Sequence, residues 1–123
     1  MRILLCEDEE VMRAAIDFRL RKQGYQVTYV GNGQDAVIAL DAALPDLLIT
    51  DLIMPHRSGI EVVQHLRQNL KSNIPVIVIS PVEEGDLILA AIKAGANDFL
   101  AKPFKPLELV LRLRCLIESQ RIR

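Results

Sequence analysis

Short apolar runs alternate with longer amphipathic runs along this chain, and the alternation repeats five times. The short runs predict strands over residues 3–6, 27–30, 47–50, 76–80 and 99–101. Residues 76–79 read Val-Ile-Val-Ile, a continuous β-branched run that is typical of a strand buried on both faces. The longer runs predict a helix after each strand, the last four over residues 34–43, 58–70, 83–94 and 106–119.

The first helical run, which follows residues 3–6, shows one apolar face. Val11, Ala14, Ala15 and Phe18 recur at the spacing of a helix. We therefore expect these four side chains to pack against the sheet.

Alternating strands and helices imply a parallel sheet with helices on both faces, joined by right-handed crossovers. Five such units in 123 residues predict an α/β fold in three layers, α/β/α, with the pattern (βα)5. In open sheets of this kind, ligands bind beyond the carboxyl ends of the strands, near the switch in strand order. The residues that finish each strand are therefore where chemistry is expected.

Composition narrows the class of protein. The 123 residues are 50% hydrophobic and 25% charged with a net charge of −1, which fits one domain with its own core. This balance argues against disorder and against nucleic-acid binding through bulk charge. No apolar run is long enough to span a membrane, and acidic residues begin at Glu7, too early for a signal peptide. Cys6 and Cys115 lack metal-site spacing, so we expect two buried free thiols in a reducing cytoplasm.

Charged and polar side chains stand where the predicted strands end. Glu7 and Asp8 follow the first strand, Asp51 follows the third, Ser80 ends the fourth and Lys102 follows the fifth. If the first and third strands are neighbours, their ends lie about 4.8 Å apart and three carboxylates crowd one rim. At an effective dielectric near 20, two charges roughly 4 Å apart repel by about 4 kcal/mol, so such a cluster needs a counter-ion.

These residue types suit a metal ion and a phosphoryl group. Mg²⁺ commonly takes one or two carboxylates together with water and phosphate oxygens. Lys102 adds a positive charge and Ser80 a hydroxyl, and both suit phosphoryl oxygens. Each feature alone has a plainer interpretation as a helix cap, a turn residue or a solvated lysine. Their convergence on one rim favours the site.

Four segments form a specific set of motifs: ILLCEDE at 3–9, DLIMPHRSG at 51–59, VIVIS at 76–80 and AGANDFLAKPF at 94–104. The run D-x-x-M-P-x-x-x-G with the later K-P-F is the most distinctive part. With these motifs, essentially the whole chain resembles the receiver domain of bacterial two-component response regulators, as in chemotaxis regulators. The resemblance implies a flavodoxin-like fold with strand order 2-1-3-4-5 and one receiver domain over residues 1–123.

The resemblance also implies roles at the rim. Asp51 would accept a phosphoryl group from a sensor histidine kinase or a phosphotransfer protein. Glu7, Asp8, Asp51 and the backbone carbonyl of Ile53 would hold Mg²⁺ or Mn²⁺. The chain would then be a cytoplasmic signalling switch, not an enzyme except toward its own phosphorylation and dephosphorylation.

Signal output is implied by the same resemblance. Lys102 would pair with the phosphoryl oxygens, Ser80 would move in to hydrogen-bond them, and Phe99 would rotate inward behind Ser80. This coupled shift would repack the face formed by the helix at 83–94, the strand at 99–101 and the helix at 106–119.

Five positions depart from the usual pattern of the family. Glu7 replaces the commoner Asp, and Phe99 replaces the Tyr that is often found at the switch position. Pro81 has no backbone N–H, so one donor to the phosphoryl group should be missing and the active state less strongly favoured. Ile53 and Val82 stand where polar side chains are common near the path of the attacking water. We expect slow autodephosphorylation from this apolar pair.

The last helix carries an apolar stripe wider than one packed face requires: Leu107, Leu109, Val110, Leu111, Leu113, Leu116 and Ile117. In the helix before it, Leu87, Ile88 and Leu89 stand in succession, so at least one should face outward. This surplus indicates a homodimer or a docked partner, and the alternative is a broad helix half-buried by its own sheet. The chain leaves no room for an output domain after these helices, so we expect a stand-alone receiver or part of a longer regulator.

Other functions fit less well. A haloacid-dehalogenase-type phosphatase needs an acid/base Asp two positions after its nucleophile, where this chain has Ile53. A flavin protein needs a phosphate-cradling loop after the first strand, and residues 7–10 are all acidic. A P-loop motif is absent from the sequence. The main rival is a non-phosphorylated pseudo-receiver that serves as a docking or dimerisation module, but such proteins normally lack the acceptor Asp or the Lys, and both are present here.

Overall fold

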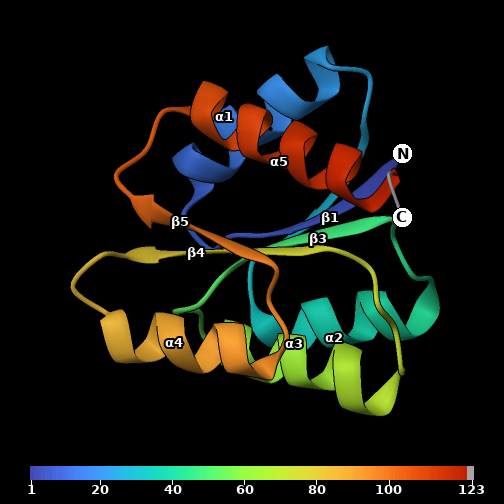
Figure 1. Cartoon of the computed structure of the whole chain (residues 1–123), viewed down its shortest axis with the longest axis vertical. Coiled ribbons are helices and arrows are strands. Elements are labelled where there is room, and N and C mark those ends of the chain that lie inside the picture. The colour runs from blue at the N-terminus through green and yellow to red at the C-terminus, as the bar shows by residue number, and fades with distance from the viewer. Residues whose placement is uncertain (122–123) are drawn as a thin grey trace.

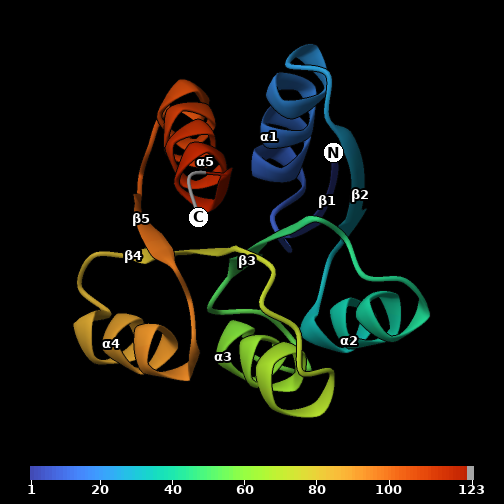
Figure 2. The ribbon, with the colours of Figure 1, turned by 45° about the vertical axis from the view of Figure 1, so that its right-hand side comes forward.

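A five-stranded parallel sheet lies between two layers of helices in the computed structural model, which describes residues 1–121 (Figure 1). The elements in chain order are β1 (Arg2–Cys6), α1 (Glu10–Lys22), β2 (Gln26–Val30), α2 (Gly33–Ala42), β3 (Leu47–Asp51), α3 (Gly59–Gln64), η1 (His65–Asn69), β4 (Val76–Pro81), α4 (Gly85–Ala94), β5 (Asp98–Lys102) and α5 (Pro106–Arg121). Neighbouring strands pair in the order β2-β1-β3-β4-β5. Helices α1 and α5 cover one face, and α2, α3 and α4 cover the other (Figure 2). The predicted three-layer flavodoxin-like fold is confirmed.

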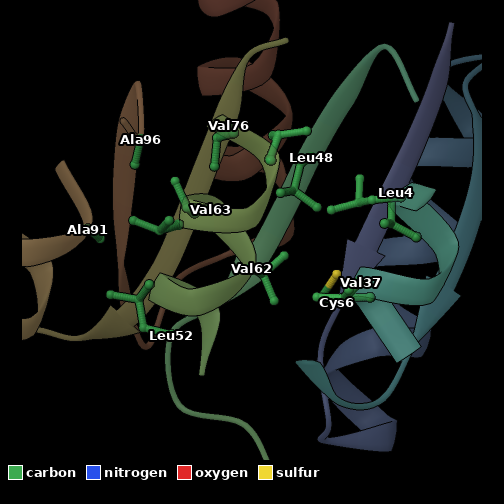
Figure 3. Packing of buried hydrophobic residues seen from close by; sticks show 14 of the residues in the cluster. Leu4, Cys6, Val37, Leu48, Leu52, Val62, Val63, Val76, Ala91 and Ala96 are labelled. Atoms are coloured by element: carbon green, nitrogen blue, oxygen red, sulfur yellow. The ribbon is translucent and has the colours of Figure 1, made fainter. Parts of the chain in front are cut away.

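Each central strand is buried on both faces, so alternate side chains enter two separate cores. Ile3 and Leu5 of β1 belong to the core under α1 and α5. Leu4 and Cys6 point the other way, into the core under α2, α3 and α4 (Figure 3). Packing in the two cores fixes the position of the strands relative to one another. It therefore also fixes where the carboxyl ends of the strands meet.

The buried face of α1 differs from the prediction. Val11 and Phe18 are 78% and 60% exposed, whereas Ile16 and Leu20 are fully buried. Two apolar stripes share the helical period along this helix, and the position of the sheet selects the stripe with the larger aliphatic side chains. The prediction of a helix was right, but its face was wrong.

The predicted helix over 58–70 contains a change of helical type. Its first part is α3, and its second part, η1, is π-helical, with the Leu70 N–H donating to the His65 carbonyl at 3.1 Å. The wider turn places Arg67 beneath the end of α4. There its guanidinium donates to the carbonyls of Gly95, Ser72 and Ile74 and to Asn97 Oδ1.

Only one of the two cysteines is buried. Cys6 lies in the core, and burial raises its pKa to about 12, although a hydrogen bond with Thr50 acts in the opposite direction. Cys115 is exposed on α5, so the expectation of a second buried thiol was wrong. The wide apolar stripe of α5 continues onto its outer side, and a local run of apolar neighbours does not tell which side faces the sheet.

In the part of the chain that the structure describes, no helix has the length and apolar character needed to cross a membrane.

Candidate functional site

Three carboxylates meet at the carboxyl ends of β1 and β3. Cys6 is the register partner of Thr50, so the residues that follow each of them, Glu7 and Asp51, come together at the rim. Carboxylate oxygens of Glu7, Asp8 and Asp51 lie within 4.8 Å of one another. Glu7 is fully buried and Asp51 is 3% exposed, while Asp8 faces solvent. The predicted crowding of negative charge is therefore present.

Lys102 reaches this cluster from a strand that is not adjacent to β3. Two strand spacings, about 10 Å, separate β5 from β3, and a long flexible side chain is needed to cross β4. The ammonium Nζ lies 2.6 Å from Asp51 Oδ2, to which it donates a hydrogen bond, and 3.1 Å from Glu7 Oε1. One positive charge thus faces three negative ones.

The pKa values of Glu7 and Lys102 are both raised, but for different reasons. Burial, and after it the charge of Asp51, raises the pKa of Glu7 to about 7, while the Glu9 backbone N–H and Lys102 act in the opposite direction. Burial alone would lower the pKa of Lys102. Its hydrogen bond and charge interaction with Asp51, and then those with Glu7, outweigh burial and raise that pKa. The site therefore holds more negative charge than Lys102 alone balances.

The backbone around Asp51 is fixed, but one of its carboxylate oxygens is only loosely held. Thr50 Oγ1 donates to the Asp51 carbonyl at 2.9 Å, and the Leu52 N–H donates to the Ile79 carbonyl at 2.9 Å. Oδ2 is taken by Lys102, whereas Oδ1 accepts a long hydrogen bond of 3.4 Å from the Ile53 N–H. Oδ1 is thus the oxygen that a metal ion or phosphorus could approach.

Ser80 lies at the same end of the sheet, fully buried in β4. Among residues 1–121, no group forms a hydrogen bond with its Oγ. Phe99 is half-buried on β5, pairs in register with Val78 and packs against the core under α2, α3 and α4. Pro81 ends β4 beside Lys102. A buried hydroxyl without a partner costs free energy, so a hydrogen bond to a group bound at this site would be favourable for Ser80.

Ile53 and Val82 stand on the outer rim of the site. They are 51% and 64% exposed, and they follow Asp51 and Ser80 by two residues each. Whether these apolar side chains keep water from the carboxylates stays a prediction.

The donor set fits a hard divalent cation. Its oxygens are carboxylates, which Mg²⁺ prefers, and their spacing lets one ion contact all three. Within the described residues, the buried Glu7 Oε1 accepts no well-aligned hydrogen bond, and its contact with Lys102 Nζ is 3.1 Å long. A cation would supply the missing partner and offset the excess negative charge.

Some groups near the site were missed from sequence. Thr50 is a polar side chain inside an apolar strand, and this signal could have pointed to a role beside Asp51. Arg13 Nη1 donates to the Glu7 carbonyl at 3.3 Å, and Arg57 Nε donates to Gln34 Oε1 at 2.8 Å. No local pattern marks these long-range contacts.

Comparison with known proteins agrees with this geometry. Residues 3–114 match the response regulator receiver domain. The phosphate regulon transcriptional regulatory protein PhoB of Escherichia coli is 34% identical over 117 residues, which cover 94% of this chain and 51% of that protein. The DNA-binding response regulator MtrA of Mycobacterium leprae is 33% identical over 113 residues, covering 92% and 49%. The chain spans about half the length of the curated relatives it matches.

Two solved structures share this architecture over most of their length. The signal receiver domain of a signal transduction histidine kinase from Syntrophus aciditrophicus superposes with a TM-score of 0.85 at 31% identity, covering 96% of this chain and 90% of that one. The chemotaxis response regulator CheY4 of Vibrio cholerae gives a TM-score of 0.85 at 26% identity, covering 92% and 95%.

Proposed function

This chain belongs to the response regulator receiver domain family, and on that premise we propose that it is a phosphoacceptor switch with Asp51 as the nucleophile. The observation that carries the proposal is the position of Asp51. It is almost fully buried among the carboxylates and 2.6 Å from Lys102 Nζ. An aspartate serving only as a turn residue would have no need of a lysine partner from a strand two places away in the sheet.

Phosphoryl transfer here needs positioning more than covalent assistance. An oxygen of the Asp51 carboxylate attacks the phosphorus of a phosphohistidine on a histidine kinase or a phosphotransfer protein. The P–N bond breaks, and its electron pair returns to the imidazole nitrogen. Glu7, Asp8, Asp51 and the Ile53 carbonyl would hold Mg²⁺ or Mn²⁺, which offsets charge on the transferring oxygens when bound.

Lys102 and Ser80 would bind the phosphoryl group once it is attached to Asp51. Lys102 already contacts Asp51 and would follow the new negative charge onto the phosphoryl oxygens. Ser80 Oγ, which has no partner among the described residues, would gain one by donating to the same group. The space vacated beside β4 would be filled by Phe99, which is half-buried on the neighbouring strand. This coupling transmits phosphorylation to the surface of α4, β5 and α5.

The departures at the rim set the strength and duration of the signal. Glu7 keeps the charge of the usual aspartate on a longer arm, and Phe99 keeps a rotating ring without a hydroxyl. Pro81 cannot donate a backbone hydrogen bond, so the phosphoryl group stabilises the active state less. The exposed apolar side chains of Ile53 and Val82 neither orient nor admit water readily, which lengthens the life of the acyl phosphate.

The surface of α4, β5 and α5 is the proposed output face, and we assign it to a second copy of the chain. Leu89 and Leu111 are 53% and 51% exposed on helices that flank β5 (Figure 2). Asp98 and Arg112 form an exposed ion pair on this face at 3.0 Å. Apolar side chains beside charges of both signs suit a self-complementary contact. An output domain or another effector partner is the alternative destination of the signal.

A pseudo-receiver that only docks or dimerises is the rival function. Such a module has no use for the acceptor and its cation partner, yet Asp51 and Lys102 form a short ion pair here. The proposal therefore keeps phosphoryl acceptance, with a histidine kinase as donor and the cytoplasm as the place of action.

A small phosphodonor tests the proposal. We expect incubation with acetyl phosphate and Mg²⁺ to add one phosphoryl mass to the intact protein, and we expect chelation of the metal to prevent it. Asp51→Asn should show no increment. An increment that persists in Asp51→Asn, or none in the parent chain, would contradict the proposal.

A further inference from the structure

The loop from Leu52 to Ser58 connects β3 to α3 and carries Ile53, whose carbonyl belongs to the proposed metal-ligand set. We call it the β3–α3 loop. Leu52 is buried and Met54 packs against the core, but Ile53, Pro55 and His56 are exposed. Core packing therefore holds the inner side of the loop and leaves its outer half without hydrophobic support.

The start of α2 holds this outer half through polar contacts. Arg57 Nε donates to Gln34 Oε1 at 2.8 Å, although the two residues are 23 positions apart in the chain. The Gly33 N–H points at the Pro55 carbonyl, with a long separation of 3.4 Å. His56, which lies between Pro55 and Arg57 in the chain, has a φ of 70°. A non-glycine residue adopts this backbone conformation only when its surroundings impose it.

A glycine is required at position 33 because the backbone of Arg57 lies so close to it. Its φ is not in the left-handed region, so a turn does not explain the residue. A Cβ at position 33 would lie 2.0 Å from the Arg57 carbonyl oxygen and 2.6 Å from its carbon. Both are backbone atoms and cannot swing aside, so a methyl group there must push α2 and the loop apart.

The loop, and not the helix, would yield to that pressure. The start of α2 is capped by Asn32, whose side chain accepts from the Asp35 N–H at 2.8 Å, and Ala36 and Val37 are buried in the core. The outer half of the loop is exposed, and its contacts with α2 are the polar ones that a methyl group at position 33 would itself disturb. At its far end, Gly59 packs with equal closeness against Asp51, a Cβ there meeting the Asp51 carbonyl oxygen at 2.2 Å. Displacement at Arg57 is therefore directed back toward Ile53.

We propose that Gly33, Gln34 and Arg57 are positioning residues for the metal site. The close approach of Gly33 and the Gln34–Arg57 hydrogen bond hold the β3–α3 loop in place, and this keeps the Ile53 carbonyl in position to bind the metal ion. The inference rests on the proposed function, since it takes Ile53 as a metal ligand. Groups behind the ligands of a metal site commonly fix ligand orientation in this way. The first turn of α2 is thus part of the metal site although it contributes no ligand.

Mg²⁺ affinity measured by calorimetry on the metal-free chain tests this inference. Gly33→Ala should weaken Mg²⁺ binding roughly tenfold, the range found when supporting groups of metal sites are removed. Gly85→Ala is the matched control, because Gly85 also opens a helix and a Cβ there meets nothing within 4 Å. The affinity of the control should equal that of the parent chain.

A second pair of variants keeps the inference open to refutation if Gly33→Ala fails to fold. Gln34→Leu removes the acceptor for Arg57 and should also weaken Mg²⁺ binding, whereas Gln34→Glu keeps an acceptor and should retain it. Urea unfolding measured in parallel distinguishes a positioning role from a purely structural one. A purely structural role would lower the free energy of unfolding without changing the Mg²⁺ affinity of the folded protein. If the folded Gly33→Ala and Gln34→Leu variants bind Mg²⁺ as tightly as the parent chain, the positioning role is wrong but the proposed metal site still stands. If the parent chain binds no Mg²⁺, the proposed metal site itself is wrong.

Discussion

Pro81 ends β4 and pairs in register with Lys102. In the proposed function, a backbone N–H at this position would face the incoming phosphoryl group. Pro81→Ala restores that donor without adding side-chain bulk. A hydrogen bond to a charged group contributes about 1.5 kcal/mol or more, so affinity for the phosphoryl mimic beryllofluoride should rise about tenfold in the presence of Mg²⁺. Fluorine NMR titration measures this affinity.

Pro75→Ala is the control for that experiment, because it makes the same change just before the opposite end of β4. It should leave the affinity for beryllofluoride unchanged. Equal affinity of Pro81→Ala and the parent chain would show that the missing N–H does not weaken the phosphoryl contact.

Ile53 and Val82 give a prediction about time rather than affinity. Both are more than half exposed at the rim, and neither can hydrogen-bond an attacking water. The phosphorylated chain should therefore lose its label slowly, and Ile53→Asn should speed the loss several-fold. Decay of radiolabelled protein measures the rate, with Leu44→Asn as a control at an exposed apolar position away from the site. A parent half-life as short as that of fast chemotaxis-type receivers would refute the prediction.

Arg67 on η1 ties together three segments at the end of the sheet opposite to the carboxylates. It donates to the carbonyls of Gly95, Ser72 and Ile74, and burial lowers its pKa. Removing the guanidinium leaves these carbonyls without their charged donor. Arg67→Met should lower the free energy of unfolding by about 3 kcal/mol in urea titrations, because several hydrogen bonds to a charged group are lost together.

Arg112→Met is the matched control for that measurement. Arg112 and Asp98 form an exposed ion pair, which contributes at most about 1 kcal/mol. A loss no larger in Arg67→Met than in Arg112→Met would show that the network around η1 is not a structural anchor.

Hydrophobic periodicity was enough to predict where the helices and strands lie. It did not predict which stripe of α1 is buried, because Val11 and Phe18 recur with the same period as Ile16 and Leu20. The sheet that decides between the stripes is assembled from residues distant in sequence. The π-helical turn at Arg67 was missed for the same reason, since its hydrogen-bond acceptors lie up to 30 residues away.

The carboxylate cluster could be predicted from sequence because parallel strands bring their carboxyl ends to one edge. Glu7 follows β1, and Asp51 and Lys102 end β3 and β5, so the strand order implied by the family resemblance brings them near one another. The clamp of Gln34 and Arg57 could not be predicted in this way. It joins a helix start to a loop, and the conformation of the loop follows from packing rather than from a period.

At the level of the whole molecule, the proposed function joins the site at the carboxyl ends of the strands to an output face at the β5 edge of the sheet. We expect phosphoryl mimicry to promote a dimer through α4, β5 and α5, because Leu89 and Leu111 leave exposed apolar surface there. Size exclusion with light scattering, with and without beryllofluoride, measures the assembly. Leu111→Glu should keep the protein monomeric in both conditions.

Ile38→Glu is the control for the dimer, since Ile38 is 57% exposed on α2, which lies on the far side of the sheet from α5 (Figure 1). It should dimerise like the parent chain. A dimer that survives Leu111→Glu but is lost in Ile38→Glu would move the interface to α2.

Localising the phosphoryl group tests the central claim most directly. Borohydride reduces an aspartyl phosphate to homoserine, which marks the modified residue for peptide mass spectrometry. After treatment with acetyl phosphate and Mg²⁺, we predict homoserine at position 51 and nowhere else. Homoserine at Asp8, or phosphate retained as an ester on Ser80, would contradict the assignment of Asp51 as the phosphoacceptor.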